Sequence, residues 1–197
     1  MTKEILFAEE GQMVGIGAHM CAMHEGVGGV LDTLSRMFLA GLRQNERCAY
    51  IAPEESVAGV RRSLEEAGVD VADAESGGSL VFITEREQLL KDGAEFDPDY
   101  LIEAIKNLFG QTMEVGYTGL RLSADVPWIS RDVPGEDRIM EFEAMADEVI
   151  NNPGVPLLAV CQYRLSELDP EDSLEILERH PLTLVGGQVY VNDKYAS

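Results

Sequence analysis

The sequence has few cysteines, few positive charges and no long apolar run. Three cysteines in 197 residues are too few for a disulfide framework. No apolar segment reaches the roughly 18 residues that a membrane span needs, and the first four residues lack the apolar core of a signal peptide. We therefore expect a cytoplasmic protein that does not insert into a membrane and whose thiols are reduced.

Positive charge is scarce relative to negative charge. The chain has 15 lysines and arginines against 36 aspartates and glutamates, for a formal net charge of −21. Phosphate backbones and anionic lipid headgroups both need a basic face, so the charge argues against nucleic acid and membrane surfaces as direct partners. The acidic run that contains Glu141 and Glu148 is typical of a solvated helix face.

A lysine is missing from the one glycine-rich segment. Residues 26–29 read Gly-Val-Gly-Gly, but Val30, Leu31 and Asp32 follow where a P-loop would carry Lys and Ser or Thr. That lysine neutralises the phosphates while backbone amides cradle them. We therefore expect no P-loop and neither binding nor hydrolysis of ATP.

Apolar periodicity instead predicts alternating short strands and helices. Asp97-Pro98 and Asp169-Pro170 are typical helix starts, with Asp as the N-cap and Pro at the first helical position. The tail has a hairpin pattern centred on Gly186-Gly187. Expected helices cover about 30–42, 53–67, 98–115 and 139–149 and begin again at 170, and expected strands cover 47–52, 80–83, 119–123, 157–162, 182–185 and 188–191.

This alternation predicts an α/β fold, a three-layer sandwich with a mainly parallel central sheet and a C-terminal β-hairpin, in one domain over residues 1–197. Ligands in such folds sit at the carboxyl ends of strands. Three segments are expected there: 19–24 after the first strand, 125–128 after the fourth and 161–164 after the fifth.

The densest group of metal-binding residue types is His19, Cys21 and His24. If the segment is extended, His19 and Cys21 lie on one face because side chains alternate along a strand. Imidazole and thiolate are ligands for zinc, iron or haem. Two alternatives stay open: hydrogen-bonded core histidines beside small buried cysteines, or a redox switch.

Motifs spread along most of the chain resemble the MEDS domain, the methanogen/methylotroph sensory domain. The resemblance implies a RecA- or KaiC-like α/β domain that senses small hydrocarbon derivatives and passes that state to a kinase or transcription regulator. Met23-His24 stands where the family often has an aromatic pair, and the chain shows no kinase core or helix-turn-helix. The matching segments are 17–21, 41–50, 119–125 with Trp128, Phe142-Glu143, 161–163 and His180-Pro181.

The strand order that this resemblance implies places Cys161 beside His19 and Cys21. The expected metal ligands are His19, Cys21, His24 and Cys161, and the redox switch would join Cys21 to Cys161. Trp128 is expected near the mouth of the pocket, although it could simply pack under a loop, and Asp125 could simply cap one. The residues expected to bind a small ligand are His19, Cys21, Asp125, Trp128, Cys161 and Tyr163.

The sequence thus favours a non-catalytic signalling domain that senses a small molecule. The alternative is a metal-, haem- or redox-sensing protein that uses the same cysteines and histidines, and an enzyme is third. No Gly-x-Ser-x-Gly elbow supports a serine nucleophile. Without a fused output domain, a sensor signals through a surface, so we expect a separate output protein and a homodimer, with the Gly186-Gly187 hairpin as a candidate edge.

Overall fold

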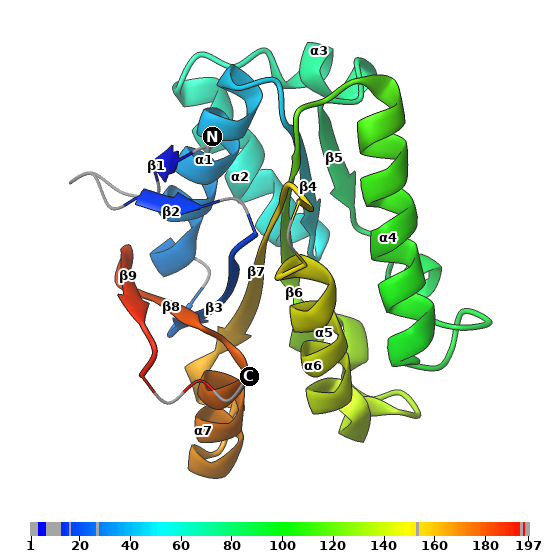
Figure 1. Ribbon diagram of the computed structural model, residues 1–197. Coiled ribbons are helices and arrows are strands. Elements are labelled where there is room, and N and C mark those ends of the chain that lie inside the picture. The colour runs from blue at the N-terminus through cyan, green and yellow to red at the C-terminus, as the bar shows by residue number, and fades with distance from the viewer. Residues whose placement is uncertain are drawn as a thin grey trace.

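The computed structural model has a seven-stranded sheet at its centre (Figure 1). It describes residues 4–6, 13–15, 17–26, 28–152, 154–193 and 195. The sheet order is β5-β4-β6-β7-β3-β8-β9, and every pair is parallel except β8 with β9. The strands are β3 (His19–His24), β4 (Arg47–Ile51), β5 (Leu80–Ile83), β6 (Leu120–Asp125), β7 (Leu157–Arg164), β8 (Leu182–Val185) and β9 (Gln188–Val191), with a separate pair β1 (Glu4–Leu6) and β2 (Met13–Gly15).

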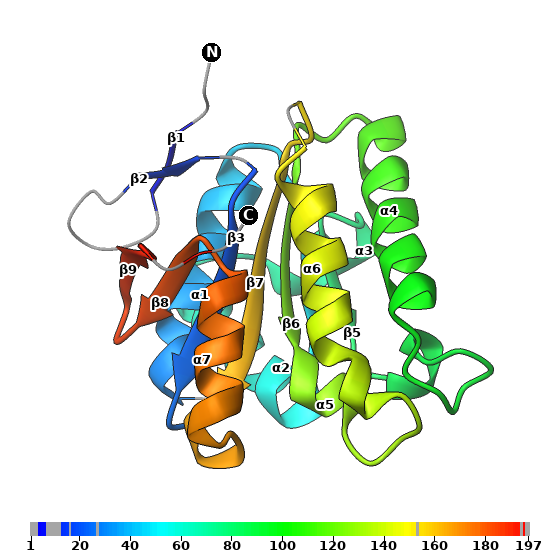
Figure 2. The same cartoon turned by 60° about the horizontal axis from the view of Figure 1, so that its bottom comes forward.

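Helices cover both faces of this sheet, so the predicted three-layer α/β class with a C-terminal hairpin is confirmed. Figure 2 shows α4, α6 and α7 side by side over one face, with α1 and α2 behind the sheet. Among the described residues, no helix is both long and apolar enough to span a membrane. The helices are α1 (Gly28–Arg43), α2 (Glu54–Glu66), α3 (Val71–Ser76), α4 (Pro98–Val115), α5 (Val126–Ser130), α6 (Ile139–Ile150) and α7 (Pro170–Arg179).

Alternation along the strands divides the core in two. Met20 and Ala22 of β3 pack with α1 and α2, whereas Cys21 and Met23 pack with α4 and α6. Successive side chains of a strand point to opposite faces, so a central strand buried on both sides is apolar throughout. Alternate residues of β3 and β7 therefore belong to the two different cores, one on each face of the sheet.

The expected helix starts and the expected hairpin are present. Asp97 accepts a hydrogen bond from the Tyr100 backbone N–H at 3.2 Å, and Asp169 accepts two at the start of α7. Gly186 and Gly187 have φ angles of 57° and 82°, which a two-residue turn of the I′ type requires and glycine adopts freely. The hairpin adds antiparallel β9 at the end of the sheet.

One expectation about the fold is wrong. The segment His19–His24 does not follow the first strand of the sheet, because it is itself an inner strand, β3, between β7 and β8. Its six residues pair with Ala159–Arg164 on one side, and Met20–Ala22 pair with Leu182–Leu184 on the other. His19 therefore lies at the beginning of β3, away from the carboxyl ends of the strands.

Candidate functional site

A cluster of four buried polar side chains lies between the sheet and α6. It contains His19 at the start of β3, Cys161 in β7, Glu143 in α6 and His180, which follows α7. His19, Glu143 and His180 have no exposed surface, and Cys161 is 5% exposed. Each residue has one atom that could bind a metal ion, and these four atoms all lie within 4.8 Å of one another. Ionisable groups at such burial are rare unless they are paired or bind a ligand.

Secondary structure explains why the four residues meet. His19 pairs with Ala159, and Cys161 lies two residues further along β7, so the parallel alternation places both on the α6 side of the sheet. Glu143 and Asp147 are one helical turn apart and therefore share the face of α6 that covers these strands. His180 sits in the short connection between α7 and β8, the neighbour of β3.

The contacts within the cluster are close. Cys161 Sγ lies 3.5 Å from His19 Nε2, which is 3.3 Å from Glu143 Oε2. The same carboxylate oxygen lies 3.2 Å from His180 Nε2, although neither of these two atoms makes a hydrogen bond. The two imidazole rings are stacked at a tilt, with centroids 4.2 Å apart. Four potential ligand atoms therefore converge on one point.

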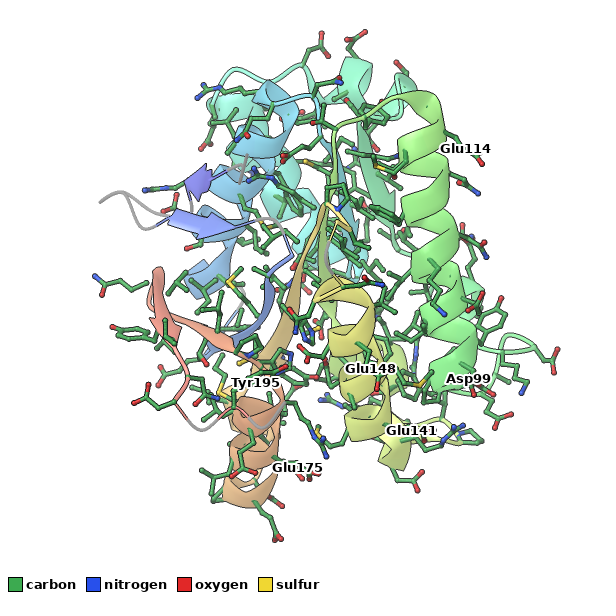
Figure 3. All side chains as sticks on the ribbon, viewed as in Figure 1. Asp99, Glu114, Glu141, Glu148, Glu175 and Tyr195 are labelled. Carbon is green, nitrogen blue, oxygen red and sulfur yellow. The ribbon has the colours of Figure 1, made fainter. Side chains whose placement is uncertain are left out.

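A second layer of groups holds the cluster from outside. His19 Nδ1 donates to Asp147 Oδ1 at 3.1 Å, and the hydroxyl of Tyr163 donates to Glu143 Oε1. Tyr195 donates its hydroxyl to Asp147 and lies between α6 and the end of α7 (Figure 3). The other acidic side chains that Figure 3 labels on α6, Glu141 and Glu148, are exposed. Only part of the predicted acidic helix face is therefore solvated.

The electrostatics favour a charged carboxylate and a protonated thiol. Burial would raise the pKa of Glu143, but His180 and His19 outweigh burial and hold that pKa below its ordinary value. Burial also works against a charged His19, yet Asp147 and Glu143 raise the pKa of its ring. Burial and the negative charge of Glu143 raise the pKa of the Cys161 thiol well above its usual range. Without a cation, Cys161 is therefore a thiol.

A small apolar cavity adjoins the cluster. Its volume is about 20 Å³, enough for one group the size of a water molecule or a methyl. Cys161 belongs to both the cluster and the cavity, because it also lines the cavity wall. The rest of the wall is apolar: Ile102, Ile105, Leu122, Ala124, Phe142, Ala146, Val149, Ile150, Ala159 and Val160.

The structure brings together three of the residues that the sequence analysis singled out for small-ligand binding. His19 and Cys161 belong to the cluster, and Tyr163 contacts it through Glu143. Cys21 shares their face of the sheet and is the register partner of Cys161, but its thiol contacts the Thr183 hydroxyl at 3.5 Å and lies outside the group of four. Cys21 is therefore a neighbour of the cluster.

His24 lies apart from the cluster. It lies at the carboxyl end of β3, and its side chain points to the opposite face of the sheet from that of His19. It lines a separate pocket of about 270 Å³ together with Glu25 and Gly29. Burial, helped by the charge of Arg164, lowers its pKa. The expected metal set of His19, Cys21, His24 and Cys161 is thus not assembled, because the two histidines stand at opposite ends of the six-residue strand β3.

Asp125 and Trp128 also lie apart. Leu122 of β6 and His19 of β3 both pair with Ala159 of β7, so they lie at the same height in the sheet. Asp125 is three residues further along β6, a distance of about 10 Å. Its carboxylate accepts a hydrogen bond from the Trp128 backbone N–H at 3.1 Å and caps α5, and burial raises its pKa. Trp128 packs against the core and does not line the cavity. Both residues take the structural roles that the sequence analysis left open.

The geometry weighs against haem and against a thiol switch. A cavity of about 20 Å³ beside Cys161 cannot hold a porphyrin. Cys21 and Cys161 face each other across β3 and β7 as free thiols, and burial raises the pKa of Cys21 to about 12. Redox-sensing cysteines are exposed and have lowered pKa values, so this pair lacks both properties.

Glu143 and His180 are the residues of the cluster that sequence reasoning missed as ligands. Both stand in segments that carry the resemblance to the family, Phe142-Glu143 and His180-Pro181. That signal gave no role to either residue. Sequence spacing could not provide one, because Glu143 is 124 positions after His19 and His180 is another 37 positions after Glu143. Only the packing of α6 and α7 on β3 brings them together.

Comparisons with known proteins agree with this architecture. The family model described as the methanogen/methylotroph, DcmR sensory domain matches residues 18–181, which include all four cluster residues. A comparison with curated proteins gives no match.

Solved structures share the fold at low identity. A KaiC-like protein from the hyperthermophilic archaeon Pyrococcus horikoshii is 14% identical, with a TM-score of 0.63 over 93% of this chain and 80% of that one. The flagellar accessory protein FlaH from Methanocaldococcus jannaschii is 11% identical, with a TM-score of 0.59 over 96% and 84%. The α/β architecture is therefore that of the RecA- and KaiC-like folds.

Proposed function

Because this chain belongs to the MEDS family, the methanogen/methylotroph, DcmR sensory domains, we propose that it is a non-catalytic sensory domain for a small, mainly apolar molecule. The family suggests the sensing role. The molecule would be a hydrocarbon derivative of one or two carbons, held between the sheet and α6, and its presence would be passed to an output protein.

The main observation that supports this proposal is that Cys161 lies where the apolar cavity meets the buried polar cluster. The residue lines the apolar cavity and also belongs to the buried His-Glu-Cys cluster. Small-molecule sites are mainly apolar with a few convergent polar groups. A methyl group would fill the cavity, while a thiol, hydroxyl or halogen on the same molecule would meet the polar side at Cys161.

The helix α6 offers a route by which binding could be transmitted. Ala146 and Ile150 of α6 line the cavity, and Glu143 and Asp147 of the same helix contact the histidines of the cluster. A ligand that fits the cavity better at one position of α6 than at another would shift the population toward that position. The outward face of α6, which carries Glu141 and Glu148, would then present a different surface to a partner.

The burial of the polar groups supports a binding role over catalysis. A Cys-His-Glu grouping resembles a nucleophile with its base, but burial and Glu143 raise the pKa of the Cys161 thiol. A catalytic cysteine needs a lowered pKa and access for substrate. The second candidate, a metal-sensing protein, draws support from the convergence of the four cluster atoms.

Filling the cavity tests the proposal. Ala146→Val adds two carbons to the cavity wall, and Ala144→Val makes the same change in the same helix at a residue that does not line the cavity. Both variants carry the same cost in helix propensity. Thermal unfolding and amide NMR shifts would be measured with methanol, methanethiol, chloromethane and ethane.

We expect at least one of these compounds to stabilise the wild type, by about 2.7 kcal/mol at 100 times its dissociation constant. Ala144→Val should keep this stabilisation and Ala146→Val should lose it. The proposed cavity site is wrong if no compound affects the wild type, or if both variants respond as the wild type does.

A further inference from the structure

The donor atoms of the buried cluster are spaced like the ligands of a metal ion. Tetrahedral zinc with bonds of about 2.0–2.3 Å holds its ligand atoms about 3.3–3.7 Å apart. The three contacts inside the cluster, Cys161 Sγ to His19 Nε2, His19 Nε2 to Glu143 Oε2, and Glu143 Oε2 to His180 Nε2, measure 3.5, 3.3 and 3.2 Å. All four atoms lie within 4.8 Å of one another.

Hydrogen bonds on the outer side fix which atom of each histidine points inward. His180 Nδ1 lies 2.8 Å from the backbone carbonyl of Ile176, which can only accept, so Nδ1 donates there and Nε2 is the nitrogen that faces the cluster. His19 Nδ1 donates in the same way to the Asp147 carboxylate. Metal-ligating histidines almost always donate their other N–H to a carboxylate or a backbone carbonyl. Both histidines therefore have the orientation of metal ligands.

Two inward atoms face each other without a well-aligned hydrogen bond. Glu143 uses Oε1 to accept from the Tyr163 hydroxyl, whereas its Oε2 and His180 Nε2 lie 3.2 Å apart in poor hydrogen-bond geometry. Both side chains are completely buried. Buried polar atoms without good hydrogen bonds cost stability unless a ligand satisfies them. A cation would satisfy both atoms together.

We propose that His19, Glu143, Cys161 and His180 bind one zinc ion in a closed tetrahedral site. Two imidazoles, a thiolate and a single carboxylate oxygen are ligands that zinc accepts, whereas magnesium and calcium need shells made of oxygen. On binding, Cys161 loses its thiol proton to solvent, and His19 loses its Nε2 proton where it carries one. The charges are then Zn²⁺ against one thiolate and one carboxylate, with Asp147 behind His19.

This site would tie three parts of the fold together. Its ligands come from β3 and β7, from α6, and from the connection between α7 and β8. With four protein ligands the ion has no open position for substrate, so its role would be to fix α6 on the sheet and to hold Cys161 at the cavity wall. The metal site does not rest on the proposed sensing of a small molecule.

Cobalt provides the direct test. The full chain, stripped of metal with a chelator, would be titrated with Co²⁺ and followed by visible and near-ultraviolet absorption, and Zn²⁺ would then be added in competition. We expect one Co²⁺ per chain, intense tetrahedral d–d bands and a thiolate-to-cobalt charge-transfer band, all displaced by one equivalent of Zn²⁺.

Substitutions assign the ligands. Cys161→Ser should abolish the charge-transfer band, and Glu143→Gln should weaken Zn²⁺ binding at least tenfold while the thiolate band remains. Cys48→Ser and Cys21→Ser are matched controls that remove buried cysteines outside the four, and both should keep the band. Far-ultraviolet circular dichroism would check that each variant is folded.

A wild-type chain that gives no thiolate-to-cobalt band would overturn the site without reference to any variant. A band that survives in Cys161→Ser but disappears in Cys21→Ser would overturn the ligand set. Stoichiometric iron in the freshly purified chain that Zn²⁺ cannot displace would overturn the assignment to zinc, because zinc normally binds such a site more tightly than ferrous iron.

Discussion

The Sγ atom of Cys161 lies 3.5 Å from Nε2 of His19, on the neighbouring strand of a parallel pair. The two residues are 142 positions apart in the sequence. Their contact depends on the pairing of β3 with β7 at the centre of the sheet, where α6 covers both strands. Two potential metal-ligand atoms therefore meet in a buried part of the fold.

Asp147 should support the cluster through its hydrogen bond with His19. Asp147→Asn keeps the shape of the side chain but removes the charge that faces His19 Nδ1, and outer partners of metal-bound histidines are worth about 10- to 100-fold in affinity. We expect Zn²⁺ affinity to fall by that factor with an unchanged thiolate-to-cobalt band. The neighbouring exposed residue provides the control, since Glu148→Gln should leave the affinity unaltered. Equal affinity in both variants would show that Asp147 does not support a metal ligand.

Gly41 should be indispensable for the packing of α1. A Cβ at this position would lie 2.7 Å from Arg121 Cδ and 2.8 Å from Cys48 Sγ. Arg121 is itself buried, with Nε donating to Glu46 Oε2 at 2.6 Å, so it cannot move without loss of that ion pair. Gly41→Ala should lower the free energy of unfolding by about 2–4 kcal/mol, as measured by urea denaturation.

Gly110 provides the matched control for this substitution. It lies in α4, and a Cβ there would meet nothing within 4 Å. Gly110→Ala should therefore raise the free energy of unfolding by about 0.5–1 kcal/mol through helix propensity. If Gly41→Ala were as stable as Gly110→Ala, the close packing of α1 on Arg121 would be wrong.

ATP should not bind, although the fold is RecA-like. The pocket of about 270 Å³ at the end of β3 is lined by Glu25, His24, apolar side chains and glycines, with no lysine or arginine among its lining residues. Millimolar ATP with Mg²⁺ should leave the melting temperature unchanged, because a ligand of the native state would raise it. A rise that Gly29→Asp removes would show a nucleotide site at this pocket.

The edge of the sheet should mediate self-association. β9 is the terminal strand, and its residues Tyr190 and Val191 are 54% and 77% exposed. Edge strands pair readily with a second chain, and a lysine on the edge opposes this. Light scattering should give a dimer for the wild type and for Val115→Lys, which changes a similarly exposed valine on α4, but a monomer for Val191→Lys. A wild type that stays monomeric up to millimolar concentration contradicts the dimer.

Local signals were sufficient to predict most of the secondary structure. Asp97 and Asp169 cap the helices that they were expected to start, and Gly186-Gly187 forms the expected turn. These features depend on interactions within three or four residues, which the sequence displays directly. The short helices α3 and α5 were not predicted, because five or six residues give too little apolar periodicity to recognise.

The site was predicted only in part, because its assembly is tertiary. Alternation along β3 correctly separated His19 and Cys21 from their neighbours, and the family resemblance correctly placed Cys161 next to them. The proposed role of His24 failed because the segment is one continuous strand that carries His24 to the other end and the other face. Glu143 and His180 reach the cluster through the packing of α6 and α7, which no local pattern encodes.

Native mass spectrometry of the freshly purified chain is the most direct test that the cluster beneath α6 is a functional centre. The account predicts the mass of the chain plus one zinc ion, with the added mass lost in Cys161→Ser and kept in Cys48→Ser. The bare chain mass for the wild type, even after purification with added Zn²⁺, would contradict it.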